Sequence, residues 1–252
     1  VLWRLGLPLD DLDGVAQREL KASEQASIEA LIDQRIATRK PAAYLTGEAW
    51  LQGVPFTFDE RFIVPRSLIA ELIADGTADA WLSDRTQRVL DLCTGNGSLA
   101  VLAAMAWPEV HVDAADLSAD ALAVAQLNIE RHEMTDRITL HQGDGLAAVH
   151  AKSYDLILCN PPYVNAESMA ALPAEYRAEP ELALAGGADG LNFIGALLGG
   201  AAQHMPGRAG LVLENGHEAE HFEATFPQLE FAWLPTSDGE QQVVLITREA
   251  LK

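Results

Sequence analysis

The chain has 252 residues, of which 49% are hydrophobic, and this composition is that of a protein that buries a core. Its 17 basic and 37 acidic residues give a net charge of −20, which repels phosphate backbones and disfavours direct binding to nucleic acid. No apolar run approaches the ~20 residues of a membrane span, and the first residues lack the layout of a signal peptide. The composition therefore predicts a cytoplasmic protein that contacts neither nucleic acid nor membrane directly.

The acidic surface has two explanations, and composition alone does not decide between them. It favours association with a basic protein partner and raises the encounter rate with it. It also keeps a protein soluble without any partner. Two cysteines, Cys93 and Cys159, are too few for a disulfide framework and agree with a reducing compartment. The oligomeric state does not follow from the sequence.

Residues 1–47 are predicted to form a small helical domain. Ser23 is expected to cap a helix that Pro41 ends. The apolar residues of this helix recur at helical spacing and are Ile28, Leu31, Ile32 and Ile36. Because the chain begins at Val1 and not at methionine, we expect this domain to be truncated.

Residues 48–65 are predicted to form a linking β-hairpin, since bulky apolar residues alternate there with turn residues. Residues 62–64 continue the extended pattern. A helix is expected to follow, capped by Ser67. Glu71 lies on this helix and either faces a functional site or caps its own helix; both interpretations stay open.

From residue 88 onward, short apolar strands alternate with helices. The expected strands are 89–92, 111–115, 138–140, 154–159 and 210–214, and the expected helices include 98–106 and 118–131. This alternation indicates an α/β fold with a parallel, Rossmann-like sheet that is covered on both faces. Two last strands, 229–234 and 242–247, are joined by the polar turn 237–240, which is short enough only for an antiparallel hairpin.

A glycine loop follows the first strand of this sheet, in the run Asp91-Leu92-Cys93-Thr94-Gly95-Asn96-Gly97. Glycines at the carboxyl edge of a sheet let a ligand approach the backbone closely. The loop also fits the G-x-G-x-x-A dinucleotide pattern, which is weak evidence alone. Asp91 opposes a pyrophosphate but suits the ammonium and sulfonium groups of S-adenosylmethionine. We therefore predict a cofactor site for S-adenosylmethionine here.

Two further acids end the next strands of the sheet. Asp116 is predicted to accept hydrogen bonds from the ribose hydroxyls of the cofactor, with Leu117 beside it, although helix capping is an alternative use of this acid. Asp144 ends the third strand, where its carboxylate can accept from an adenine amino group. First and fourth strands are neighbours in such a sheet, so Cys93 and Cys159 are expected to lie close together without a redox role.

The sharpest motif is Asn160-Pro161-Pro162-Tyr163, directly after the fourth strand. The prolines stiffen the loop and remove backbone donors, which leaves the Asn160 side-chain oxygen and the Pro161 carbonyl as acceptors. These can hold both N–H groups of a planar amide or amine while Tyr163 stacks on it. Acceptors that pull on these hydrogens return electron density to a poorly nucleophilic nitrogen.

The stretch from His217 to His221 matches H-E-x-x-H, which on a helix suits two zinc ligands and a glutamate base. A zinc protease needs a third ligand, and no histidine follows His221. We predict no metal site. Gly216 is expected to turn the chain into a helix, with His217, Glu218 and Glu220 in its solvated first turn.

Together, the glycine loop, Asp116 and Asn160 to Tyr163 resemble S-adenosylmethionine-dependent amino methyltransferases. The whole chain resembles the HemK/Prm family of protein N(5)-glutamine methyltransferases, and further matches are Val64-Pro65-Arg66-Ser67, 172–177, 179–184 and Asp189-Gly190-Leu191. The resemblance implies a class I methyltransferase domain over residues 66–252, Asn160, Pro161 and Tyr163 as catalytic residues, and Pro162 as a further part of the glutamine site. The cofactor set is Asp91, Leu92, Cys93, Thr94, Gly95, Gly97, Asp116, Leu117, Asp144 and Asn160.

Two branches of this family differ after the linking hairpin. The release-factor branch usually reads P-R-P-x-T-E, whereas this chain has Pro65-Arg66-Ser67, which resembles the branch that methylates a glutamine of the third protein of the large ribosomal subunit. Release factors are the alternative substrate. An adenine-N6 DNA methyltransferase would use the same loop but conflicts with the net charge of −20. A non-catalytic dinucleotide-binding module would leave Asn160 to Tyr163 unexplained.

Overall fold

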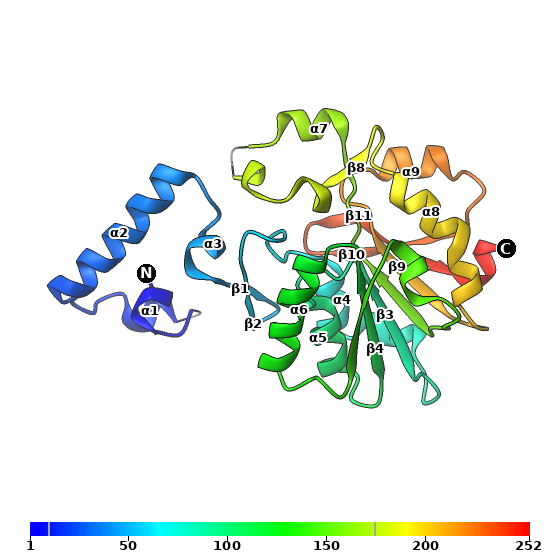
Figure 1. The fold of residues 1–252 in the computed structure, drawn as a ribbon, viewed down its shortest axis with the longest axis horizontal. Helices are drawn as coiled ribbons and strands as arrows, with labels where there is room; N and C mark the ends of the chain where they lie inside the picture. The colour runs from blue at the N-terminus through cyan, green and yellow to red at the C-terminus, as the bar shows by residue number, and fades with distance from the viewer. Residues whose placement is uncertain (10, 174) are drawn as a thin grey trace.

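The computed structural model describes residues 1–9, 11–173 and 175–252, with a small helical part beside a larger α/β part (Figure 1). The helical part contains the 3₁₀ helix η1 and three α-helices. Their bounds are Trp3–Leu5 for η1, Leu12–Val15 for α1, Ala22–Thr38 for α2 and Ala42–Thr46 for α3. Ion pairs from Arg39 to Glu175 (2.7 Å) and from Lys40 to Glu60 link this part to the rest.

The start of α2 differs from the prediction, because Ser23 does not cap it. The helix begins at Ala22, and the N–H of Lys21 at the N-cap donates to Glu24 Oε2 at 2.9 Å. A glutamate three residues into the helix thus replaces a serine cap. Of the apolar residues that predicted the helix, Ile28 is buried, whereas Ile36 is 67% exposed.

The linking hairpin consists of β1 (Glu48–Leu51) and β2 (Val54–Thr57), which pair antiparallel. It packs on α6 (Ala119–Arg131), where Asn128 Oδ1 accepts from the Thr57 N–H at 2.7 Å. Residues 62–64 form a loop, so the expected extended segment is wrong there. Phe62 packs edge-on against Phe58, and its burial explains the apolar pattern without a strand.

The larger part is built on a seven-stranded sheet in the order β10-β11-β9-β6-β3-β4-β5. Five strands are parallel and β11 is antiparallel to both of its neighbours. Their bounds are β3 Arg88–Leu92, β4 His111–Asp116, β5 Ile138–Gln142, β6 Leu156–Cys159, β9 Gly210–Glu214, β10 Ala232–Thr236 and β11 Gly239–Thr247. This confirms the predicted α/β fold with a terminal antiparallel hairpin. From β3 the chain adds β4 and β5 on one side of the sheet and then crosses over to add β6 on the other side. Ligands bind at this switch point between β3 and β6 in such folds.

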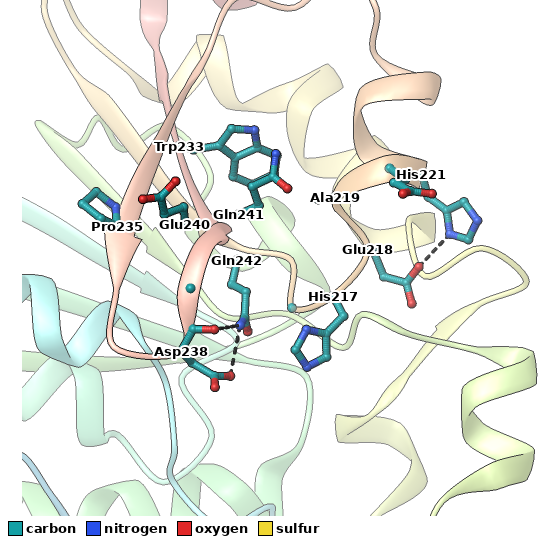
Figure 2. A pocket seen from close by; sticks show the side chains of 13 residues that line it. His217, Glu218, Ala219, His221, Trp233, Pro235, Asp238, Glu240, Gln241 and Gln242 are labelled. Carbon is teal, nitrogen blue, oxygen red and sulfur yellow. Dashed lines mark hydrogen bonds and ion pairs between the residues drawn. The ribbon is translucent and has the colours of Figure 1, made fainter.

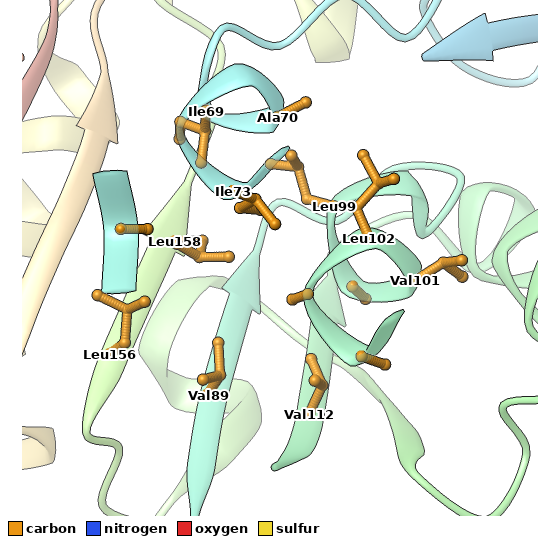
Figure 3. Close-up of a cluster of buried hydrophobic side chains, with 14 of the residues drawn as sticks. Ile69, Ala70, Ile73, Val89, Leu99, Val101, Leu102, Val112, Leu156 and Leu158 are labelled. Atoms are coloured by element: carbon orange, nitrogen blue, oxygen red, sulfur yellow. The ribbon is translucent and has the colours of Figure 1, made fainter. Parts of the chain in front are cut away.

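Helices cover both faces of the sheet. Alternate residues of each strand point to opposite faces, so one face receives Val89, Val112 and Leu156 and the other Leu90 and Ile157. Figure 3 shows the first face, where Ile69 and Leu102 lie over the strands. The helices are α4 (Ile69–Ala74), α5 (Ser98–Ala106) and α6 on that side, with α8 (Asn192–Ala201) and α9 (Ala219–Thr225) in the second cluster. Among the described residues, no helix is both long and apolar enough to cross a membrane.

Some strand bounds differ from the prediction. Tyr154 precedes β6, because its N–H donates to the His204 carbonyl instead of the sheet. Leu229 precedes β10, because its N–H closes a turn on the Phe226 carbonyl at 3.0 Å. Elements that were not predicted include β7 (Val164–Asn165), α7 (Ala166–Ala171), β8 (Ala185–Gly187) and α8. β7 and β8 form a short parallel pair directly after the loop 160–163.

Candidate active site

A cavity of about 250 Å³ opens at the carboxyl ends of β3, β4, β5 and β6. Its walls include most of the residues that the sequence assigned to the cofactor. They are Leu92, Cys93, Gly95, Asp116, Leu117, Asp144 and Asn160. A Cβ built on Gly95 would meet nothing within 4 Å, so the loop faces open space there. This open face above the loop fits a cofactor that lies against the backbone.

Asp91, Thr94 and Gly97 do not line this cavity but hold the loop that does. Asp91 is fully buried, and its Oδ2 accepts from the Thr94 hydroxyl (2.5 Å) and the Ala100 N–H (2.9 Å) at the start of α5. Burial raises the pKa of Asp91 to about 7, against these two hydrogen bonds. Its Oδ1 has no hydrogen-bond partner in the part of the chain that the structure describes. One acceptor is thus left at the strand end for a donor.

Asp116 ties the glycine loop to the next helix. Its Oδ2 accepts from the Gly95 N–H at 2.9 Å, and its Oδ1 accepts from the Ser118 N–H at 2.8 Å. Burial raises the pKa of Asp116, and both hydrogen bonds oppose this rise. Each oxygen can accept a second bond from a ligand hydroxyl, so loop positioning and ribose binding do not exclude each other.

Phe193 on α8 lines the same cavity, and the sequence did not predict it. A Cβ on Gly145 would lie 3.6 Å from its ring, so glycine leaves this aromatic surface accessible beside Asp144. An aromatic face next to an acceptor suits a planar base with an amino group. No motif surrounds Phe193, and only the packing of α8 brings it to this position.

The loop Asn160-Pro161-Pro162-Tyr163 joins this first cavity to a second cavity of about 640 Å³. Asn160 lines both cavities, Pro162 lines the first, and Pro161 and Tyr163 line the second. The loop has this central place because Cys159, just before it, pairs with Leu92 on β3 and with Leu213 on β9. A group bound in the second cavity can therefore meet a ligand of the first at Asn160.

Tyr163 is tightly enclosed by three glycines and is not free to turn toward a substrate. Added Cβ atoms would lie 2.4 Å from its ring at Gly216, 2.4 Å from its carbonyl at Gly190 and 2.8 Å from its Cα at Gly186. Its hydroxyl donates to Glu214 Oε1 at 3.3 Å. Three glycines thus hold Tyr163 as a fixed part of the wall, and its stacking on a substrate amide stays a prediction.

Glu214 is a second residue that the sequence did not identify. It ends β9, is 3% exposed, and lines the second cavity. Its Oε2 accepts from the Ser67 hydroxyl (2.6 Å) and the Leu68 N–H (2.9 Å). Burial raises the pKa of Glu214 to about 7, although these hydrogen bonds act to lower it. Its place in the sequence, as an acid at the end of an apolar strand like Asp91 and Asp116, could have indicated a site residue.

The role predicted for Ser67 as a helix cap is wrong. α4 begins at Ile69 with Leu68 at its N-cap, and no side chain caps the helix. The Ser67 hydroxyl donates to Glu214, and its oxygen is 3.3 Å from the Ile69 N–H. A hydrogen bond to a charged carboxylate is stronger than one between neutral groups, so the bond to Glu214 sets the orientation of the Ser67 side chain.

Arg66 fixes the segment that follows the loop 160–163. Its guanidinium donates to both carboxylate oxygens of Glu179, at 2.9 and 2.5 Å, and lies 4.8 Å from the centre of the Tyr176 ring. Glu179 also accepts from the Val64 N–H. These contacts join two segments that are remote in sequence into one wall of the second cavity.

The H-E-x-x-H stretch lines an open groove of about 900 Å³ (Figure 2). α9 begins at Ala219, with Glu218 at its N-cap. Glu218 is buried and not solvated as predicted, because its carboxylate accepts from Asn165 Nδ2 (2.5 Å) and His221 Nδ1 (2.6 Å). Figure 2 shows His217 apart from the joined pair of Glu218 and His221. Within the described ranges, no three His, Cys, Asp or Glu residues are placed to hold a metal.

Glu71 serves neither of the two predicted roles. Its carboxylate accepts from the N–H and the hydroxyl of Ser237, at 2.9 and 2.6 Å, and so anchors the β10–β11 turn to α4. Cys93 and Cys159 are free thiols at the ends of neighbouring strands, as expected, since Cys159 pairs with Leu92, the residue before Cys93. Burial raises the pKa of the Cys159 thiol, which keeps it protonated.

Comparison with known proteins agrees with this geometry. The Methyltransferase small domain family matches residues 75–177. Similar solved structures include a methyltransferase from Pyrococcus furiosus (16% identity, TM-score 0.56, 88% of this chain and 98% of that chain). Another is the hMettl16 catalytic domain (13% identity, TM-score 0.58, 90% of this chain and 80% of that chain). The fold and the matched domain are those of a class I methyltransferase.

Sequence relatives narrow this class. The ribosomal protein uL3 glutamine methyltransferase of Bordetella pertussis is 51% identical, over 100% of this chain and 85% of the relative. The proteins of the same name from Burkholderia pseudomallei and Neisseria gonorrhoeae are 49% and 45% identical, over 98% and 100% of this chain and 83% and 84% of theirs. The chain belongs to the family of ribosomal protein uL3 glutamine methyltransferases. The relatives carry the name of the ribosomal branch and not of the release-factor branch.

Proposed function

We propose that this chain transfers a methyl group from S-adenosylmethionine to the side-chain amide nitrogen of a glutamine in ribosomal protein uL3. One observation carries the proposal: Asn160 lines both the cofactor cavity and the second cavity, so that it can hold an amide against a ligand of the first. The names of the relatives support uL3 as the substrate.

The residues of the first cavity fit S-adenosylmethionine, which supplies an electrophilic methyl group when bound. Gly95 leaves room for close approach, and Asp116 offers carboxylate acceptors for the ribose. Asp144 and Phe193 would bind the base, the first by a hydrogen bond and the second by its ring face. Asp91 holds the loop, and its free Oδ1 is an acceptor for the ammonium group.

The catalytic loop acts on the glutamine. Its amide nitrogen is a weak nucleophile, because its lone pair is delocalised over the carbonyl. The Asn160 side-chain oxygen and the Pro161 carbonyl accept its two N–H groups, which orients the nitrogen and increases its electron density. The rigid Pro162 and the enclosed Tyr163 hold this geometry.

We divide the chain into the helical domain 1–47, the linking hairpin 48–65 and the methyltransferase domain 66–252. The net charge of −20 complements a basic protein such as a ribosomal component, and this partner places the enzyme in the cytoplasm.

The Asn160→Ala variant tests the proposal with labelled S-adenosylmethionine and purified uL3. We expect methyl transfer to fall to background while thermal unfolding stays close to wild type. Gln126→Ala is the matched control, since this amide side chain lies on α6 outside the lining of both cavities and donates to Glu130 on the same helix. Wild-type turnover in Asn160→Ala would exclude the proposed role of this residue.

A further inference from the structure

Glu214 is a buried carboxylate whose described hydrogen bonds involve no cation. Its donors are the hydroxyls of Ser67 and Tyr163 and the N–H of Leu68, all of them neutral. Arg66, which lines the same cavity, is bound to Glu179. Burying a carboxylate without a compensating charge is unfavourable for folding. A carboxylate of this kind in a cavity is therefore a candidate for a functional residue.

The reaction has a requirement that the catalytic loop alone does not meet. A primary amide that gains a methyl group must lose one of its two N–H protons to become the neutral N-methyl amide. Asn160 and Pro161 offer neutral carbonyl oxygens, which polarise an N–H bond but do not retain the proton. A carboxylate does, and Glu214 shares the second cavity with both residues.

We infer that Glu214 takes up this proton through the hydroxyl of Tyr163, an inference that rests on the proposed function. The amide nitrogen forms a bond to the methyl carbon, whose bond to sulfur breaks with the electron pair remaining on sulfur. As the methyl bond forms, one N–H leaves its acceptor in the loop and gives its proton to the Tyr163 oxygen, while the Tyr163 hydroxyl proton passes to Glu214 Oε1. Glu214 later releases the proton to solvent, which completes the balance.

The contacts of Glu214 suit this task. Ser67 and Leu68 hold Oε2, which leaves Oε1 for the Tyr163 hydroxyl at 3.3 Å. Gly216 and Gly190 hold Tyr163 against this carboxylate. Burial raises the pKa of Glu214 to about 7, where a group both accepts and returns a proton readily. Burial also raises the pKa of Tyr163, so it relays a proton as a neutral phenol.

Other titratable groups around Glu214 are engaged elsewhere or lie further along the cavity. Cys159 stays protonated, Glu71 binds Ser237, and Glu218 binds Asn165 and His221. The groups that face Glu214 or share its cavity are Tyr163, Cys159, Arg66, Tyr176, His217, Glu218 and Asp238.

The test is the pH profile of kcat for transfer to uL3, measured for the whole chain and four variants. Wild-type kcat should fall as the pH drops through about 7, since protonated Glu214 accepts no proton. Glu214→Gln and Tyr163→Phe should lower kcat by roughly 10²-fold or more and remove this dependence. Ser67→Ala removes a hydrogen bond to the charged form, so its midpoint should move to higher pH. Glu220→Gln, an exposed acid on α9, should keep the wild-type profile.

Thermal unfolding and cofactor calorimetry establish that each variant is folded. An unchanged pH midpoint in Glu214→Gln, or a change in KM alone, would overturn the inference and leave the proposed function intact. If Glu214→Gln does not fold, the midpoint of Ser67→Ala decides, and an unshifted one overturns the inference. No transfer to uL3 by the unmodified chain would overturn the proposed function itself.

Discussion

Gly216→Ala tests whether the position of Tyr163 controls activity. An added Cβ at this position would lie 2.4 Å from Tyr163 Cε2 and 2.8 Å from Cδ2. Carbon atoms in contact prefer about 3.5–4.0 Å, so the ring must move by about 1 Å. A displacement of this size in a catalytic constellation costs roughly 100-fold in rate, which corresponds to about 2.7 kcal/mol in the activation barrier.

The same substitution also strains the backbone. Gly216 has a φ of 54°, and an alanine in this left-handed conformation costs about 1–2 kcal/mol. In a chain of this length, such a loss lowers Tm by roughly 2–8 °C. Gly207→Ala is the matched control, because Gly207 has a φ of 48° and its Cβ would meet nothing within 4 Å. Both variants should lose similar stability, but only Gly216→Ala should lose catalytic rate.

The assay combines steady-state kinetics of methyl transfer with thermal unfolding of both variants. A kcat for Gly216→Ala equal to that of Gly207→Ala would refute the reasoning, since the backbone cost would then be the whole effect. A large rise in KM without a change in kcat would also contradict it. That result would assign Tyr163 to binding alone.

Three further predictions concern other parts of the chain. Asp116→Ala should weaken S-adenosylmethionine binding by roughly 10- to 100-fold in calorimetry, because a charged acceptor is lost; an unchanged Kd would remove Asp116 from the site. Phe193→Ala should raise the same Kd by roughly 10-fold, and an equal affinity would show that the ring does not contact the base. Burial acts to raise the pKa of Asp113, but hydrogen bonds from Lys152 and His141 outweigh it and hold the pKa below its ordinary value. The ionised carboxylate therefore stabilises the fold above pH ~4, and this stability is lost as the pH falls through the lowered pKa. Urea unfolding should show a weaker acid dependence in Asp113→Asn, and equal pH profiles would contradict this account.

Much of the fold was predictable because it depends on local patterns. Runs such as 89–92 and 210–214 are apolar apart from one acid each, Asp91 and Glu214, as expected for buried parallel strands, and helices of ordinary length separate them. The turn 237–240 is too short for a crossover, which established the antiparallel hairpin. The pair of β7 and β8 was missed, since strands of two and three residues have no periodicity to detect.

The site residues also divide into those that a local motif predicts and those that only the packing of the fold brings together. Asn160 to Tyr163 and the glycine loop are contiguous motifs, and the structure places them around two connected cavities. Phe193 and Glu214 reach these cavities through the packing of α8 and β9. No local pattern reveals Phe193, and the only local indication of Glu214 is its place at the end of an apolar strand. Ser67 was misassigned for the same reason: a distant buried carboxylate competes for its hydroxyl. Glu218 is buried because Asn165, on another element, donates to it.

The central claim is that this chain methylates a glutamine of uL3. The most direct measurement is to incubate it with labelled S-adenosylmethionine and a mixture of ribosomal proteins and release factors, and to locate the label by peptide mass spectrometry. Our account predicts label on the side chain of one glutamine of uL3, and none when Asn160→Ala is used. Label on a release factor, or on any residue type other than glutamine, would contradict it.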